Sequence, residues 1–220
     1  MIVYEGSVIT CDATGSVRRF LVEDRGVVAF VGDALPQRFA AAPRTALGAR
    51  SLAPAFADTH IHFMSHALFS TGLDVRASKS IEDTVRRVRD FAHARPQGML
   101  IGFGASAHSV AERRLPTRAD LDAACPDRPT FVVKYDGHAC IVNSSLLRAL
   151  PPRVASNRGF DAESGLMTQE AFFRVTDFVT AKVSLVKTLD DMLAAIDAMA
   201  THGIGMVHSV TGVGFPWTRT

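Results

Sequence analysis

The stretch Pro54–His62 reads PAFADTHIH, an apolar run that passes directly into the pattern Asp58-x-His60-x-His62. Side chains two positions apart on a β-strand point to the same face, so these three are expected to line one side of a strand. In parallel α/β folds, sites are built at the carboxyl ends of the strands. Two neutral imidazoles there suit Zn²⁺ or a similar divalent metal, and Asp58, one pleat deeper, could orient a ligand.

Short apolar strands alternate with helical segments after residue 51. The strands predicted in this part of the chain are Leu52–Ala57, Met99–Phe103, Thr130–Tyr135 and Ile204–Val210. Strand–helix alternation is typical of a parallel sheet whose strands are joined by crossover helices. An α/β barrel and an open doubly wound sheet share this order of elements, so the alternation by itself leaves both open.

Three helices are expected between these strands. The first is capped by Ser80 and ends near Gly98, a short one begins at Thr117, and a third begins at Thr188 and ends at Gly203. The apolar side chains expected to face the core are Ile81, Val85, Val88 and Ala92 in the first helix and Met192, Leu193, Ile196 and Met199 in the third.

Residues 1–50 carry a different pattern. Three strand-like segments, Ile2–Thr10, Val17–Glu23 and Val27–Gly32, are rich in Val, Ile, Tyr and Phe, and Gly-containing turns separate them. The stretch 36–50 is looser, rich in Ala and interrupted by two prolines. We therefore predict that residues 1–32 form a small antiparallel unit outside the main α/β sheet.

Composition narrows the class of protein. The 220 residues are 47% apolar and 21% charged, as in ordinary globular domains, and the net charge of +2 favours neither a nucleic-acid nor a membrane partner. No apolar stretch approaches the ~18 residues of a membrane span, and the amino terminus does not resemble a signal peptide. The odd set Cys11, Cys125 and Cys140 indicates reduced thiols and a cytoplasmic location.

Four blocks of the chain together resemble one family. The run PAFADTHIHF (54–63) is similar to the first barrel strand of the amidohydrolase superfamily. The segment LPTRADLDAACPDRPTFVVKYDGHACIVNSSLL (115–147) resembles the middle of the amidohydrolase 3 branch, the YtcJ-like proteins, and GLMTQEAF (165–172) and GIGMVHSV (203–210) resemble its later blocks. Residues 1–50 look like the first half of its β-sandwich.

The resemblance implies a fold and a reaction. The fold is α/β: a partial (β/α)8 barrel of the TIM type over residues 51–220, preceded by the small β-sandwich portion of residues 1–50. The reaction is hydrolysis of a C–N bond in a small-molecule amide, cyclic amide or related group, not a peptide bond. One or two divalent metal ions, zinc before others, would serve as cofactor, and His60 and His62 match the family's first two metal ligands.

Further ligands of the family lie on later strands, for which this sequence has no positions. They are a metal-bridging side chain (often a carboxylated lysine), two histidines and an aspartate. One alternative is therefore an inactive truncated fragment that self-associates or needs a complementary C-terminal chain. Another is a deaminase-type reaction on the same barrel.

Histidines at two other strand ends are further candidates. His138 follows the strand Thr130–Tyr135 and could donate a hydrogen bond to a developing oxyanion, or bond to backbone carbonyls as a loop residue. Asp136 could orient His138 or cap a turn. His208, near the end of the strand Ile204–Val210, suits a substrate-binding or supporting role and equally suits core packing.

Two polar residues have strong local interpretations. Glu170 lies in the first turn of a predicted helix, where an acid favours the helix dipole, and a role in a pocket is the alternative. Asn143 precedes Leu146 and Leu147 and is predicted to cap a helix.

Overall fold

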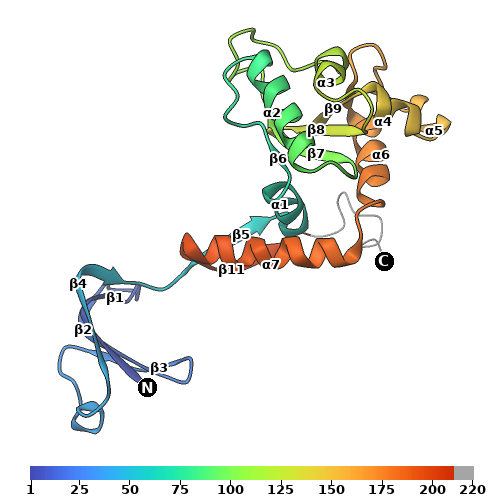
Figure 1. The fold of residues 1–220 in the computed structure, drawn as a ribbon. Coiled ribbons are helices and arrows are strands. Elements are labelled where there is room, and N and C mark those ends of the chain that lie inside the picture. Colours follow the sequence, from blue (N-terminus) through green and yellow to red (C-terminus); the bar gives the residue numbers. More distant parts are fainter. Residues whose placement is uncertain (211–220) are drawn as a thin grey trace. The chain divides into compact units, whose positions relative to one another are not determined.

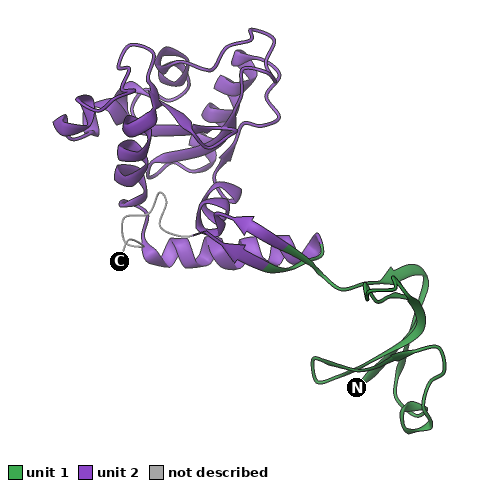
Figure 2. Cartoon of the chain, turned by 180° about the vertical axis from the view of Figure 1, so that it is seen from behind, with its two compact units in different colours: residues 1–57, 203–206 green, residues 58–202, 207–220 purple. Residues whose placement is uncertain are grey.

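The computed structural model describes residues 1–210. The chain divides into two compact units (Figure 2). Unit 1 comprises residues 1–57 and 203–206, and unit 2 comprises residues 58–202 together with the chain from Val207 onward. The division of the chain at residue 50 into a sandwich portion and a barrel portion remains a prediction. Within the described part of the chain, no helix has both the length and the apolar character needed to cross a membrane.

Unit 1 is built on a four-stranded sheet in the order β3-β2-β1-β4 (Figure 1). Its strands are β1 (Ile2–Ile9), β2 (Val17–Asp24), β3 (Val27–Gly32) and β4 (Arg44–Leu52). The first three strands pair antiparallel, which confirms their prediction from the sequence. The prediction of a loose stretch over residues 36–50 is wrong, because β4 pairs parallel with β1.

There is a physical reason why β4 was not predicted from the sequence. Its sequence, RTALGARSL, contains Ala and Gly where strands favour branched or aromatic residues. The hydrogen bonds that hold it come from β1, about forty residues earlier, across a register shift between Glu5 and Ser7. Behind the sheet, Val3, Phe20, Val22 and Phe39 form the core of unit 1, with Phe39 supplied by the short 3-10 helix Gln37–Phe39.

A separate pair of strands carries the Asp-x-His-x-His pattern. It consists of β5 (Phe56–Ile61) and β11 (Ile204–Ser209). The strand predicted at residues 52–57 is therefore misplaced along the chain. Leu52 is the last residue of β4, and the next strand begins only at Phe56. The strand at 204–210 is confirmed, apart from its last residue.

Unit 2 contains a five-stranded sheet in the order β10-β9-β8-β7-β6. Strands β6 (Leu73–Asp74), β7 (Leu100–Ala105) and β8 (Thr130–Lys134) run parallel, which confirms the strands predicted near 99–103 and 130–135. Strands β9 (Ala139–Val142) and β10 (Leu166–Thr168) were not predicted and pair antiparallel. The tight turn between β8 and β9 passes through Gly137, whose φ of 75° suits glycine.

Helices cover both faces of this sheet (Figure 1). On one face lie α2 (Ile81–Ala94) and α3 (Arg118–Ala124), and on the other lie α4 (Ser144–Ala149), α5 (Pro152–Ala155) and α6 (Gln169–Thr180). Alternate residues of β8 serve the two cores: Val132 packs with α2 and α3, whereas Phe131 and Val133 pack with α4 to α6. The described strands of unit 2 thus form an open α/β layer and do not close into a ring.

The predicted helix starts are confirmed in α2 and α3 but not in α7 (Leu185–Thr201). Ser80 and Thr117 each accept a hydrogen bond from the third residue of their helix. Helix α7 starts one turn before Thr188, capped by Ser184.

The buried face of α7 agrees with the prediction at Met199 but differs from it at Leu193 and Ile196. Leu193 and Ile196 are 63% and 50% exposed, because α7 packs on α1 (Phe63–Ser70) through a stripe that begins at Thr188 and Asp191. The buried Asp191 carboxylate has a hydrogen-bond donor there, since the Thr71 hydroxyl donates to it at 2.8 Å.

The three cysteines are free thiols, as expected from their odd number. Cys11 is exposed, whereas Cys125 and Cys140 are buried. Burial raises the pKa of the Cys140 thiol, so this group stays protonated and packs as a small apolar side chain.

Candidate metal centre

His60 and His62 lie at the carboxyl end of β5, where the strand passes into α1. His60 is the penultimate residue of the strand, and His62 is the residue before the first turn of α1. Buried Phe63 anchors the start of that helix, which holds the adjacent His62 in place. Both imidazoles are exposed, and their ring centroids lie 5.9 Å apart in an edge-to-face arrangement.

Two hydrogen bonds define the surroundings of these imidazoles. The Asp58 carboxylate accepts from the backbone N–H of His60 at 3.1 Å, so it supports the backbone of the strand end. The Nδ1 atom of His62 lies 3.2 Å from the carbonyl oxygen of Val210. When Nδ1 carries the proton and donates to this carbonyl, the lone pair is on Nε2, which is the arrangement of a metal-binding histidine.

The pairing of β5 with β11 brings a third histidine to the same face. The N–H of Phe56 donates to the Gly203 carbonyl, and the N–H of Val210 donates to the Ile61 carbonyl, each at 2.8 Å. Both strands advance in the same direction between these two bonds, so the pair is parallel. This register sets His208 opposite His60, and side chains at matched positions of neighbouring strands point to one face.

These imidazoles are suitable ligands for a divalent metal, but a metal ion needs more protein ligands than they provide. Among residues 1–210, no three His, Cys, Asp or Glu side chains stand close enough together to hold a metal ion. The side chains of His60, His62 and His208 are all exposed. The two imidazoles of β5 fit a metal by their chemistry, whereas catalytic zinc usually takes three protein ligands.

His138 and Asp136 lie elsewhere, in the turn between β8 and β9. The Asp136 carboxylate accepts from Lys134 Nζ at 2.7 Å and from the backbone N–H of His138 at 3.2 Å. The hydrogen bond from Lys134 is the main cause that lowers the pKa of Asp136. Asp136 therefore holds the turn: its hydrogen bond with His138 is to the backbone N–H, and the exposed His138 side chain acts on it through charge. The sequence reasoning missed Lys134, although the spacing Lys-x-Asp at a strand end is a signal for such a pair.

Glu170 and Asn143 occupy helix starts. Glu170 is exposed in the first turn of α6, where its charge meets the positive end of the helix dipole. Asn143 is buried and caps α4, accepting from the N–H of Leu146 at 2.9 Å, as predicted. Among the predicted site residues, the structure thus gathers Asp58, His60, His62 and His208 on or next to one strand pair. Asp136 and His138 lie in the turn between β8 and β9, and Glu170 lies in α6.

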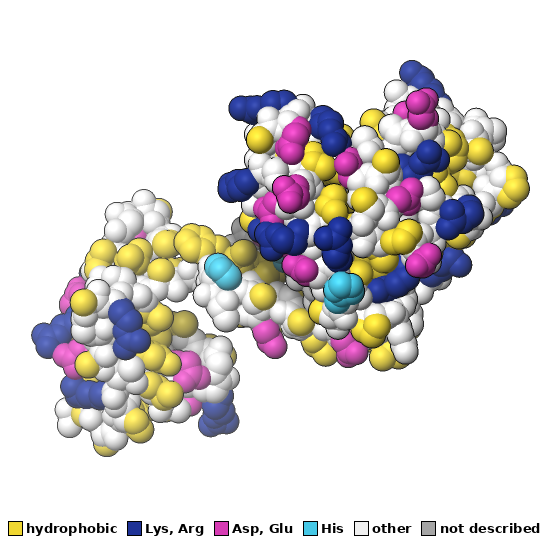
Figure 3. Space-filling model, turned by 45° about the horizontal axis from the view of Figure 1, so that its top comes forward, with side chains coloured by type: hydrophobic (Ala, Val, Ile, Leu, Met, Phe, Trp, Pro, Cys, Tyr) yellow, Lys and Arg dark blue, Asp and Glu magenta, His cyan; other side chains and the backbone are white. Residues whose placement is uncertain are grey.

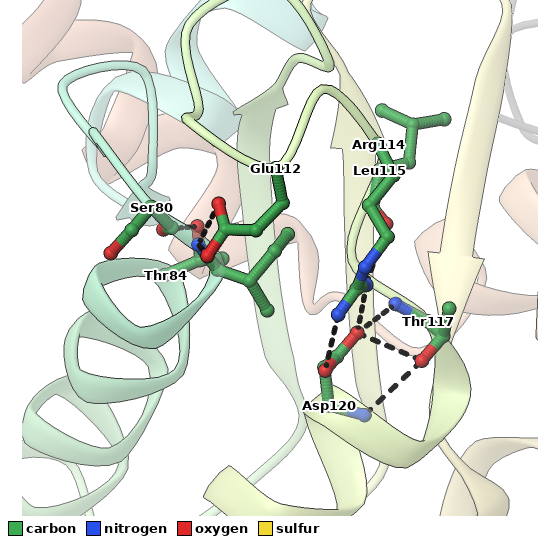
Figure 4. A network of polar contacts seen from close by, with 8 residues as sticks. Ser80, Thr84, Glu112, Arg114, Leu115, Thr117 and Asp120 are labelled. Carbon is green, nitrogen blue, oxygen red and sulfur yellow. Dashed lines mark hydrogen bonds and ion pairs between the residues drawn. The ribbon is translucent and has the colours of Figure 1, made fainter.

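Carboxylates also fix the loops that follow β6 and β7, at the edge where parallel α/β folds build sites (Figure 4). Glu112, in the loop after β7, accepts with both oxygens from the N–H of Ile81, at 3.1 and 3.0 Å. Asp120 bonds Thr117 and Arg114 in the same stretch of chain. On the face shown in Figure 3, Lys and Arg side chains of unit 2 are interspersed with Asp and Glu.

Comparison with known proteins shows where this chain belongs. Over 153 residues it is 26% identical to the N-substituted formamide deformylase of Arthrobacter pascens, covering 67% of this chain and 28% of that protein. Over 150 residues it is 27% identical to YtcJ of Bacillus subtilis (strain 168), covering 68% of this chain and 27% of YtcJ. The chain thus spans about a quarter of the length of these curated relatives.

A solved structure has a similar fold. The crystal structure of a metal-dependent hydrolase from Pyrococcus horikoshii OT3 matches 96% of this chain and 43% of its own, with a TM-score of 0.70 and 21% identity. At this identity the match establishes the fold alone. The family model for amidohydrolases of the Amidohydro_3 type matches residues 46–219. With this match extending over most of its length, the chain belongs to the amidohydrolase family.

Proposed function

We propose that this chain provides the first metal ligands of a metal-dependent hydrolase that cleaves C–N bonds in small-molecule amides, cyclic amides or related groups, and not peptide bonds. The observation that carries the proposal is the pair of imidazoles at the end of β5, 5.9 Å apart, in an Asp-x-His-x-His pattern. Membership of the amidohydrolase family supports the hydrolytic reaction. The name of the Arthrobacter relative, a deformylase of N-substituted formamides, supports the C–N bond as target.

The proposed roles follow from position. His60 and His62 hold the metal, Asp58 keeps the strand end rigid, and His208 stands beside His60 to contact substrate or metal. A bound divalent ion such as zinc lowers the pKa of a water ligand toward ~7 and polarises a carbonyl group. His138 is proposed to donate a hydrogen bond to the developing oxyanion, with Asp136 holding its turn.

Glu170 is proposed to bind the substrate or to support the residues that bind it. In this proposal residues 51–220 are the first part of a (β/α)8 barrel and residues 1–50 part of a β-sandwich. The parallel strands β6, β7 and β8 support the barrel, since barrel strands are parallel and their carboxyl ends form the site.

The proposal requires groups beyond His60 and His62. Two imidazoles fall short of the three protein ligands of a typical catalytic zinc, so further ligands come from additional chain, in a longer protein or a complementary C-terminal partner. The purified 220-residue chain is therefore expected to bind zinc weakly and to show no turnover of N-acyl or cyclic amides.

Zinc titration of purified variants tests the assignment. We expect His60→Ala and His62→Ala each to raise the zinc Kd by about tenfold or more, because each removes one of two ligands. His93→Ala is the control, since His93 is an exposed histidine of α2. His208→Ala shows whether the third histidine contributes. Equal zinc affinity in His60→Ala, His62→Ala and His93→Ala would exclude a metal site on β5.

A further inference from the structure

A cavity of about 330 Å³ opens in unit 2 at the amino edge of the parallel strands. Its wall includes Gly72, Met99 and Arg128, which lie one or two residues before the starts of β6, β7 and β8. The opposite wall is the junction of α6 and α7, from Val179 to Lys187. The volume lies within the range of small-molecule sites. It is at the end of the strands opposite to the edge that follows β7 and β8.

The charged residues that line this cavity are all cationic. They are Arg95, Arg128, Lys182 and Lys187, and no Asp or Glu is among the lining residues. Lys187 is paired with the Asp191 carboxylate at 2.6 Å, so its charge is balanced. Around the cavity three positive charges therefore remain without a lining carboxylate.

The other three cations are held in place without being neutralised. Arg128 donates to the backbone carbonyls of Ala92, Gln97 and Gly98 at 2.9 to 3.1 Å, which fixes its position but leaves its full charge. Arg95 lies over the ring of Phe91, 4.9 Å from its centroid, and Lys182 lies 4.6 Å from the ring centroid of Phe178. Within residues 1–210, neither Arg95 nor Lys182 forms an ion pair.

The rest of the cavity suits the remainder of a small organic anion. Apolar side chains line it, among them Leu68, Phe91, Met99 and Ile101. Ser184, the cap of α7, also lines it, and the first N–H groups of that 17-residue helix add positive potential. A cavity lined by both cations and apolar side chains favours an anionic head group attached to an apolar body.

We propose that this cavity binds a small organic anion, whose phosphate or carboxylate group is attracted by the lining cations Arg95 and Lys182 and whose apolar body packs on lining residues such as Leu68, Phe91 and Met99. The ligand's charge offsets the unbalanced cations, and its apolar part covers surface that is otherwise exposed to water. The site does not depend on the proposed metal centre, because it shares no residue with β5 or β11.

Calorimetric titration of the full 220-residue chain tests the proposal with four probes. Phenyl phosphate and benzoate carry the two anionic head groups, benzyl alcohol has a similar body without charge, and inorganic phosphate has no body. We expect the tighter-binding aromatic anion to bind at least about tenfold more tightly than either benzyl alcohol or inorganic phosphate. The tighter of the two anions identifies the head group.

Variants locate the binding. The double variant Arg95→Gln, Lys182→Gln is expected to raise the Kd of the tighter-binding anion by about tenfold. The Kd of benzyl alcohol, which has no charge, should not change. Lys182→Arg keeps the charge and should keep the affinity. Arg25→Gln is the control, since the Arg25 side chain is 93% exposed in unit 1. Equal affinity for benzyl alcohol and the anions, or an equal loss in Arg25→Gln, would overturn the proposal.

Discussion

At the scale of single residues, Asn143 uses every atom of its amide. Its Oδ1 accepts from the N–H groups of Thr130 at 3.0 Å and Leu146 at 2.9 Å, and its Nδ2 donates to the carbonyls of Cys125 and Arg128 at 2.8 Å each. The residue is fully buried. One side chain therefore ties the start of β8 and the loop that precedes it, between α3 and β8, to the start of α4.

Removing this amide should be costly. We expect Asn143→Ala to lower the free energy of unfolding by about 3 kcal/mol, because it leaves backbone donors and acceptors buried without partners. Asn157→Ala is the matched control. Asn157 donates to the carbonyls of Arg153 and Val154 but is partly exposed, so water replaces it at a cost of about 1 kcal/mol or less. Urea unfolding of both variants measures the difference. Equal losses in the free energy of unfolding would show that the buried hydrogen bonds of Asn143 contribute no more than the exposed ones of Asn157.

At the scale of elements, α3 depends on a reciprocal cap. The N–H of Asp120 donates to Thr117 Oγ1 at 3.4 Å, and the Asp120 carboxylate accepts from the Thr117 N–H at 2.7 Å and from Arg114 Nη1 at 2.6 Å (Figure 4). Burial acts to raise the pKa of Asp120, but the hydrogen bonds from Arg114 and Thr117 outweigh it, and the pKa is lowered from the ordinary 3.8.

The sign of this shift determines its pH dependence. A carboxyl whose pKa is lowered by folding adds stability above its ordinary pKa and loses it as the pH falls through the folded-state pKa. We expect Asp120→Asn to cost about 1 kcal/mol at neutral pH and progressively less as the pH falls below ~4. Urea unfolding across this pH range measures it. In Asp127→Asn, the control at an exposed carboxylate, no such dependence is expected, and a loss in Asp120→Asn that persists at low pH would exclude the ionic contribution.

At the scale of the whole molecule, each unit has a core of its own. Unit 1 buries Val3, Phe20, Val22 and Phe39 beside its four-stranded sheet. Unit 2 buries two larger clusters, one on each face of its five-stranded sheet. Chains with separate cores often unfold in separate steps, since each core melts cooperatively on its own.

We therefore expect two thermal transitions in calorimetry. Val22→Ala should lower the midpoint of one transition, and Val132→Ala should lower the midpoint of the other, because each removes fully buried methyl groups from one core only. Val28→Ala, at a strand position that is 58% exposed, should change neither by more than about a degree. A single transition that moves equally in Val22→Ala and Val132→Ala would show that the chain unfolds as one unit.

Local patterns were enough to predict the features that depend on neighbours in sequence. Ser80, Thr117 and Asn143 were predicted as caps, and each accepts from an N–H three residues later. Strands β7 and β8 were predicted because they are continuous apolar runs that are buried in any α/β sheet. Four blocks of sequence identified the amidohydrolase family, as the family match confirms. That the Asp-x-His-x-His pattern makes His60 and His62 metal ligands stays a prediction.

Tertiary structure alone decided the features that depend on distant partners. Strand β4 exists because β1 supplies its hydrogen bonds. Helix α7 buries Thr188 and Asp191 instead of Leu193 because α1 supplies a packing surface there and Thr71, just after α1, supplies a hydroxyl. His208 faces His60 only through the parallel register of β5 and β11, which are separated by more than 140 residues. A cap needs three or four consecutive residues, whereas register and the choice of a buried face need two segments to meet. The residues of one segment therefore cannot specify them.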